Sequence, residues 1–156
     1  MKKNRKKIIG LALIITIVLI SIGVFLRQDS TFTLETEGQE WTGKKEKTIK
    51  KESESIAIPG FESLTFVKNE RKQSVNFYNP DINNCYFKLS ILLPDGKKIW
   101  ESKYIEPGNG IYEINLDRTL EEGEYDGAIL KYECYTMDSV QTALNGSEIK
   151  FKLSII

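Results

Sequence analysis

The stretch LEEGEYDGAILKYECY, residues 120–135, joins a turn to a long apolar run. Every second residue from Ala128 to Cys134 is suited to a core, and Lys131 and Glu133 lie between them. Alternation of this kind is typical of a β-strand that buries one face. The stretch therefore predicts a strand over residues 125–137, with Cys134 on its inner face.

The same signature extends to both sides of this stretch. Short apolar runs are separated by turn segments rich in Gly, Asn, Asp and Pro, the residues that favour turns. Asp95-Gly96 is a strong hairpin signal. Strands are expected at 55–67 (interrupted by Pro59-Gly60), 74–79, 85–93, 98–105, 111–116, 125–137 and 148–156. Residues 55–156 are thus predicted to be an all-β domain, an antiparallel sandwich of about seven strands.

The chain has two cysteines, and both are predicted to face the core. Alternate residues from Cys85 to Leu93 are apolar, as they are around Cys134. In an exported domain two inward cysteines can form a disulfide; two buried thiols that pack as small hydrophobic groups are the alternative. A catalytic thiol is disfavoured, because the chain has no histidine to act as its base.

The turn before the long strand resembles a known structural device. Leu120, Gly123 and Tyr125 are spaced as in the tyrosine corner of immunoglobulin-like and fibronectin type III domains. The resemblance implies that the Tyr125 hydroxyl bonds to a backbone group a few residues upstream. It covers residues 55–156 and departs from the antibody pattern, since 85–93 contains no Trp and Cys134 follows Tyr125 by nine residues.

The N-terminus carries the signature of a membrane anchor. Residues 1–7, MKKNRKK, include five basic side chains, and residues 8–26 are uncharged, with 14 of 19 being Ile, Leu, Val or Phe. As a helix this run spans about 28 Å, close to the apolar thickness of a bilayer. The positive-inside rule predicts a cytoplasmic N-terminus and an extracellular C-terminal domain. A cleaved signal peptide, with Ser21 and Gly23 at the cleavage site, is the alternative.

Residues 27–54 are predicted to be a flexible linker, because they are rich in Lys, Glu, Thr, Ser and Gly. Trp41 is the exception, as an interfacial anchor or a group that docks on the domain. Beyond residue 26 there are 17 basic and 22 acidic residues, a net charge of −5. A mildly acidic domain argues against a nucleic-acid partner.

No catalytic residue, cofactor or metal ligand is assigned from the sequence. The absence of histidine removes most general-base and metal schemes. NPDINN, residues 79–84, carries possible Ca²⁺ ligands but lacks EF-hand spacing, so an ordinary turn is favoured. Trp100, Tyr104 and Tyr112 are candidate binding aromatics, and their spacing also suits a core face.

The whole chain resembles small uncharacterised single-pass membrane proteins of Gram-positive bacteria. This resemblance rests on the anchor, the linker and the segments SVNFYNPDINNCYFKLSILLPDGKKIW and LEEGEYDGAILKYECY. It implies a cell-membrane location, with residues 8–26 in contact with lipid. The function expected is that of a noncatalytic module that binds another envelope protein or assists envelope assembly. Binding of a carbohydrate or cell-wall polymer, through Trp100 and Tyr104 exposed together, is the alternative.

Overall fold

The structure, a computed structural model, describes residues 34–43 and 55–156, which are all-β. The expected membrane helix, 8–26, lies outside the described residues. The strands are β1 (Thr36–Glu37), β2 (Gln39–Glu40), β3 (Ser63–Phe66), β4 (Lys72–Tyr78), β5 (Cys85–Leu92), β6 (Lys98–Glu101), β7 (Tyr104–Ile105), β8 (Asn109–Asn115), β9 (Gly123–Thr136) and β10 (Ala143–Ile155).

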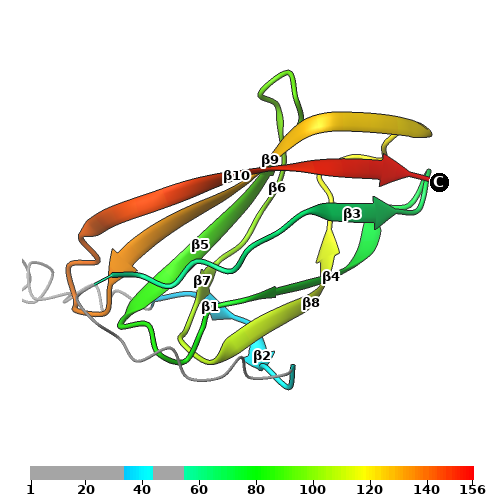
Figure 1. Cartoon of the computed structure of the whole chain (residues 1–156). Helices are drawn as coiled ribbons and strands as arrows, with labels where there is room; N and C mark the ends of the chain where they lie inside the picture. Colours follow the sequence, from blue (N-terminus) through cyan, green and yellow to red (C-terminus); the bar gives the residue numbers. More distant parts are fainter. Residues whose placement is uncertain (1–33, 44–54) are drawn as a thin grey trace, which may run out of the picture. The chain divides into compact units, whose positions relative to one another are not determined.

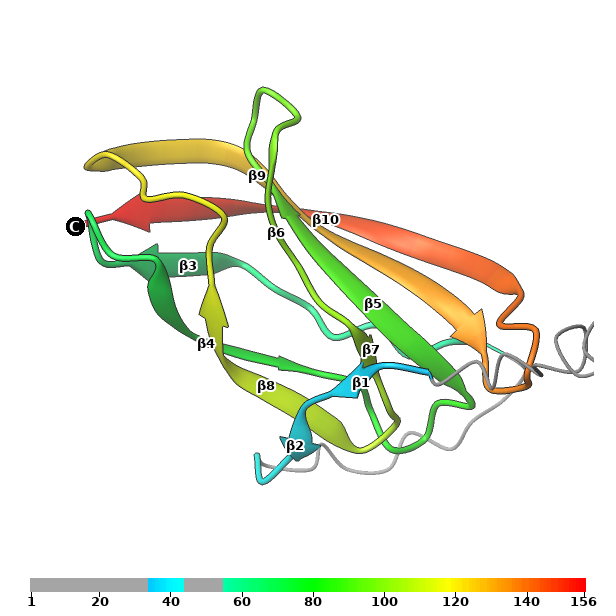
Figure 2. The ribbon, with the colours of Figure 1, turned by 180° about the vertical axis from the view of Figure 1, so that it is seen from behind.

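The strands form two sheets, an arrangement consistent with a β-sandwich (Figures 1 and 2). The larger sheet has the order β1-β7-β5-β9-β10-β3, with β6 also paired to β5, and the smaller has the order β2-β8-β4. Most pairs are antiparallel, as expected. The wholly antiparallel prediction is wrong at two edges, because β1 pairs with β7 and β3 with β10 in parallel. A tight hairpin joins only antiparallel neighbours, and in both of these pairs the two strands are far apart in the sequence.

The core lies between the two sheets and follows the predicted alternation in β5 and β9. Cys85, Phe87 and Leu89 on β5, and Leu130 and Tyr132 on β9, are all at most 2% exposed. The smaller sheet contributes Val75, Phe77, Ile111 and Ile114. Apolar side chains from both sheets therefore share one core.

Bulges change which side chains face inward. Between Ile91 and Leu92 of β5 the partner strand β6 has one extra residue, so Ile99 and Trp100 are both buried although they are adjacent in sequence. A bulge lets two residues oppose one and turns the following side chains. The predicted strand 98–105 divides into β6 and β7. Between them, the Ser102 hydroxyl accepts a hydrogen bond from the Leu89 amide at 2.8 Å.

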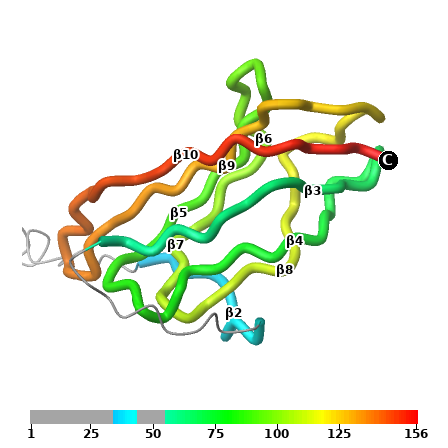
Figure 3. The backbone as a smooth tube through the Cα atoms, viewed as in Figure 1, coloured from blue at the N-terminus to red at the C-terminus, as the bar shows by residue number. Residues whose placement is uncertain are grey.

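The first predicted strand, 55–67, is paired only over β3. The segment before β3 runs extended (Figure 3), and Ile56, Ile58 and Phe61 pack against the core. Pro59 has no N–H to donate to a neighbouring strand. The Ala57 amide and carbonyl are instead bonded by the side chain of Asn83, at 2.8 and 3.0 Å.

Residues 34–43, which we call the strap, correct the prediction of a linker through residue 54. The strap begins the compact unit that continues to Ile156. Its β1 pairs with β7 in the larger sheet, and its β2 pairs with β8 in the smaller sheet. Backbone pairing at a sheet edge requires no apolar side chains. The polar composition of residues 34–43 therefore gave no sign that they form strands.

Candidate binding surface

Three tyrosines meet on the outer face of the larger sheet. Tyr104 on β7, Tyr86 on β5 and Tyr135 on β9 are half-buried, and each is next to a buried residue that faces inward. The ring centroid of Tyr104 lies 5.7 Å from that of Tyr86 and 5.2 Å from that of Tyr135. Tyr86 and Tyr135 are directly opposite in the β5–β9 ladder. We call these three residues the tyrosine surface.

The residues beside the tyrosine surface are charged and paired. Lys88 lies opposite Glu133 in the ladder, and its Nζ is 2.9 Å from a carboxylate oxygen of Glu101. The hydrogen bond to Glu101 raises the pKa of Lys88. Burial, with Glu133 close by, raises the pKa of Tyr135. The tyrosine surface is therefore a patch of phenol groups bordered by the charged side chains of Lys88, Glu101 and Glu133.

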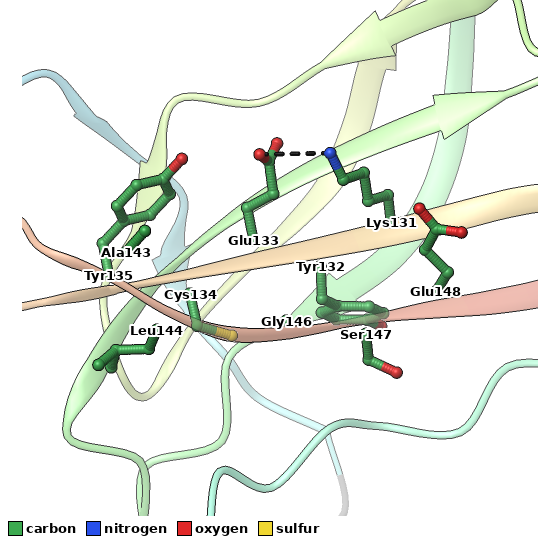
Figure 4. Close-up of a pocket in the computed structure, with 10 residues that line it drawn as sticks. All are labelled: Lys131, Tyr132, Glu133, Cys134, Tyr135, Ala143, Leu144, Gly146, Ser147 and Glu148. Carbon is green, nitrogen blue, oxygen red and sulfur yellow. Dashed lines mark ion pairs between the residues drawn. The ribbon is translucent and has the colours of Figure 1, made fainter.

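A pocket of about 330 Å³ beside Tyr135 is lined by residues of β9 and β10. The register shifts by one extra residue on β10 between Leu144 and Ser147. A Cβ on Gly146 would lie 2.2 Å from the carbonyl oxygen of Tyr132, so only glycine fits this bulge. Figure 4 shows Lys131, Glu133 and Tyr135 on one side of the β9 ribbon, with Lys131 and Glu133 forming an ion pair of 3.3 Å.

The three aromatic residues predicted from the sequence do not form one surface. Trp100 is 6% exposed, and its ring lies 5.7 Å from that of Phe77 in the core. Tyr112 is on β8 of the smaller sheet, where its hydroxyl accepts a hydrogen bond from the Thr42 amide at 2.9 Å. Of the three, only Tyr104 belongs to the tyrosine surface.

Tyr86 and Tyr135 are not among the aromatics predicted from the sequence, because the alternation of their strands indicates only the inward-facing residues. A signal was present: both occupy the outward parity, Tyr86 next to Cys85 and Tyr135 next to Cys134. The neighbouring outward positions hold the charged residues Lys88, Glu133 and Lys131, which are typical of a solvated face. A large aromatic side chain among them is unusual and could have indicated a binding surface.

Cys85 and Cys134 are buried thiols in the structure and carry no disulfide. They lie on neighbouring strands of one sheet and occupy diagonal positions, since Cys85 is opposite Thr136 and Cys134 opposite Phe87. This arrangement differs from that of antibody domains, in which the two cysteines lie on different sheets and the disulfide joins the sheets. Burial, followed by the nearby Cys85, raises the pKa of Cys134 to about 12. A thiol with so high a pKa is a weak nucleophile at neutral pH.

The residues of the predicted tyrosine corner lie at the start of β9. The Tyr125 hydroxyl donates a hydrogen bond of 3.2 Å to the backbone carbonyl of Glu121, four residues upstream. Leu120 is buried, and Gly123 has a positive φ of 155°. The bond ties the end of the turn to the strand that follows it.

The NPDINN segment uses its amides to join loops. The Asn79 side chain donates to the carbonyls of Cys85 and Ile105, both at 2.9 Å, and its oxygen accepts from Asn83 at 2.8 Å. The Asn83 oxygen accepts from Ala57. The two amide oxygens thus accept hydrogen bonds from the protein, and the side chains of Asn79 and Asn83 join this loop to residues 57, 85 and 105.

Comparisons with protein-family models, with characterised proteins and with solved structures find no match. Within residues 34–43 and 55–156, no helix is long and apolar enough to cross a membrane. In the same part of the chain, no three acidic or cysteine side chains gather in a way that could hold a metal ion.

Proposed function

We propose that this protein is a noncatalytic binding module of the cell envelope whose contact surface for a partner protein is Tyr86, Tyr104 and Tyr135. The observation that carries the proposal is the meeting of three half-buried tyrosines, from three neighbouring strands, on a solvent-facing sheet. Tyrosine is enriched in protein interfaces because it buries a large apolar ring and keeps a hydroxyl for a hydrogen bond. The charged residues beside it form a polar rim.

The ring geometry favours a protein partner over a carbohydrate. Tyr104 meets Tyr86 at 55° and Tyr135 at 90°. A sugar ring stacks on a flat aromatic face, and these rings do not share a plane. The pair Trp100 and Tyr104, on which a sugar platform was expected, is not exposed together, since Trp100 is 6% exposed.

The proposal includes a location. Residues 8–26 would anchor the chain in the membrane, with the N-terminus in the cytoplasm and the β domain outside. The apolar length and the basic residues before it support this orientation. The bond from Tyr125 to Glu121 supports the interpretation of the domain as immunoglobulin-like.

Site-specific photocrosslinking in intact cells tests the contact surface. A photoreactive residue at Tyr86 or Tyr135 should give a discrete crosslinked product that Tyr104→Ala abolishes. The matched control is Val140, which is 74% exposed and lies outside the tyrosine surface. Equal products from Val140 and Tyr86 would show that the surface has no specific partner.

Protease treatment of intact cells tests the location separately. A C-terminal tag should be removed by external protease, and the mature chain should still begin at residue 1. A tag that is protected, or a mature chain that begins near Val24, would contradict the anchored orientation and leave the tyrosine surface to be tested by crosslinking.

A further inference from the structure

The strap is attached to the domain through a few specific contacts and contributes nothing to the core. The core cluster consists of residues between 66 and 155, and most side chains of the strap are exposed. Figure 2 shows β1 beside β7, and the strap then crosses to β8 of the other sheet. The remaining strands therefore complete their core without the strap.

The surface that receives the strap is fitted to its sequence. The backbone carbonyl of Glu35 accepts a hydrogen bond from the Tyr104 amide at 3.2 Å, and the Glu35 carboxylate forms an ion pair of 3.0 Å with Lys103. The Glu37 carboxylate accepts from the Lys103 amide at 2.7 Å. Gly38, with a φ of 101°, makes the corner between the two sheets. Both acidic side chains therefore contact Lys103, the residue just before β7.

Trp41 makes the most specific contact. Its ring stacks on Tyr78 with centroids 4.0 Å apart and an angle of 12°, and its Nε1 donates to Asn76 at 3.1 Å. A Cβ on Gly110 would lie 2.8 Å from the Trp41 ring and 3.0 Å from the Phe77 carbonyl, so glycine leaves room for the ring. The receiving surface thus combines two strand edges with a place for one indole.

We propose that this surface is a strand-addition site that also accepts the strap of a second copy of this chain, giving a strand-exchanged dimer. Another copy carries the same residues, so its strap makes the same contacts and exchange has a low energetic cost. Residues 44–54 connect the strap to the domain, and eleven residues can extend to about 40 Å. The strap of the same chain competes at an effective concentration on the order of millimolar. The exchanged form therefore grows with local protein concentration.

Cysteine crosslinking of the full chain in mild-detergent micelles tests this inference. Chains with Glu35→Cys are mixed with chains with Lys103→Cys and oxidised with oxidised glutathione; both positions are exposed, at 73% and 55%. We expect a covalent dimer that increases with protein concentration. A chain with both substitutions should close within itself. The Glu40→Cys chain is the matched control, because Glu40 is exposed on the strap but pairs with Asn109 in the other sheet.

The Trp41→Ala substitution distinguishes a dimer formed by strap exchange from one formed by random encounters between two chains. On the Glu35→Cys chain it weakens the donated strap, and the dimer should fall at least about fivefold. On the Lys103→Cys chain it weakens the resident strap, and the dimer should rise. The inference would be overturned if the dimer is no more abundant than that of the Glu40→Cys control, or if Trp41→Ala changes the amount of dimer in the same direction on both chains. It would also be overturned if the double variant does not form a disulfide within one chain. None of these results depends on the tyrosine surface.

Discussion

On their inner face, β5 and β9 place the ring of Phe87 5.4 Å from that of Tyr132; on their outer face, the same strands place Tyr86 opposite Tyr135. Phe87 is 0% and Tyr132 2% exposed, whereas the outer tyrosines are half-buried. Tyr86 and Phe87 are adjacent on β5, and Tyr132 and Tyr135 are three residues apart on β9, yet the members of each pair have different surroundings. The inner rings fill the space between two sheets, and the outer rings lie on a face where they remain partly exposed to solvent.

The inner ring should dominate stability. Phe87→Ala leaves a cavity between the sheets, and we expect a loss of about 3–5 kcal/mol in the free energy of unfolding. The matched variant Tyr86→Ala, the preceding residue on the other face, should lose less than about 1 kcal/mol. Urea unfolding, followed by the fluorescence of the buried Trp100, measures both. Equal losses would show that the outer face is also part of the packing.

A polar group on the inner side sharpens the comparison. Asn79 is 0% exposed and bonds the carbonyls at the start of β5 and the end of β7. Asn79→Ala would leave these carbonyls and the Asn83 amide with fewer partners, and the loss should be about 2–3 kcal/mol. Asn84→Ala is the control, since Asn84 lies exposed in the same loop; a change within about 0.5 kcal/mol is expected there. Similar losses at both positions would contradict this role for Asn79.

The outer rings should couple weakly to one another. The edge-to-face contact of Tyr104 with Tyr135 is worth about 0.5–1.5 kcal/mol in a double-mutant cycle. Tyr104→Ala and Tyr135→Ala should therefore be less than additive in unfolding free energy. The same cycle with Tyr112, which lies on the smaller sheet, should be additive. Additivity in both cycles would mean that the tyrosine surface is three independent side chains.

The contrast also explains how far the sequence could predict the molecule. Regular alternation located β5, β9 and the C-terminal half of β10, because each buries every second side chain. It failed where residues of both parities are buried: Ile99 lies in the core beside Trp100 at the bulge of β6, and on β8 both Ile111 and Ile114 are buried. A single extra residue reverses the parity of all that follow, and nothing local in the sequence marked it.

The binding surface was harder to predict than the fold for a related reason. Tyr86, Tyr104 and Tyr135 come from three strands, and only the pairing of those strands brings the rings together. The strap was missed because it is attached through backbone pairing and through contacts of Glu35, Glu37 and Trp41 with residues distant in the sequence. Trp41 was noted as an exception within a polar segment, but its partner Tyr78 is 37 residues away.

The charged part of the outer face should give the smallest effect, and one that depends on pH. Glu101 lies 2.6 Å from Lys98 and 2.9 Å from Lys88, and the hydrogen bonds to these two lysines lower its pKa. A carboxylate whose pKa is lower in the folded state adds stability that is present above its unfolded value and lost as pH falls through the folded value. Its side chain is 33% exposed, so screening should keep the contribution below about 1 kcal/mol.

Glu101→Gln removes this charge without changing the size of the side chain. Unfolding midpoints at pH 6 and pH 3 should therefore differ less in the variant than in the unsubstituted protein. The control is Glu106→Gln, a carboxylate with no ion pair among those found in the described chain. If Glu101→Gln leaves the pH dependence unchanged, the ion pairs of Glu101 with Lys98 and Lys88 add no net stability to the folded protein. The stability of the two strands would then come from the packing of their inner face, and the charges of their outer face would only position the side chains there.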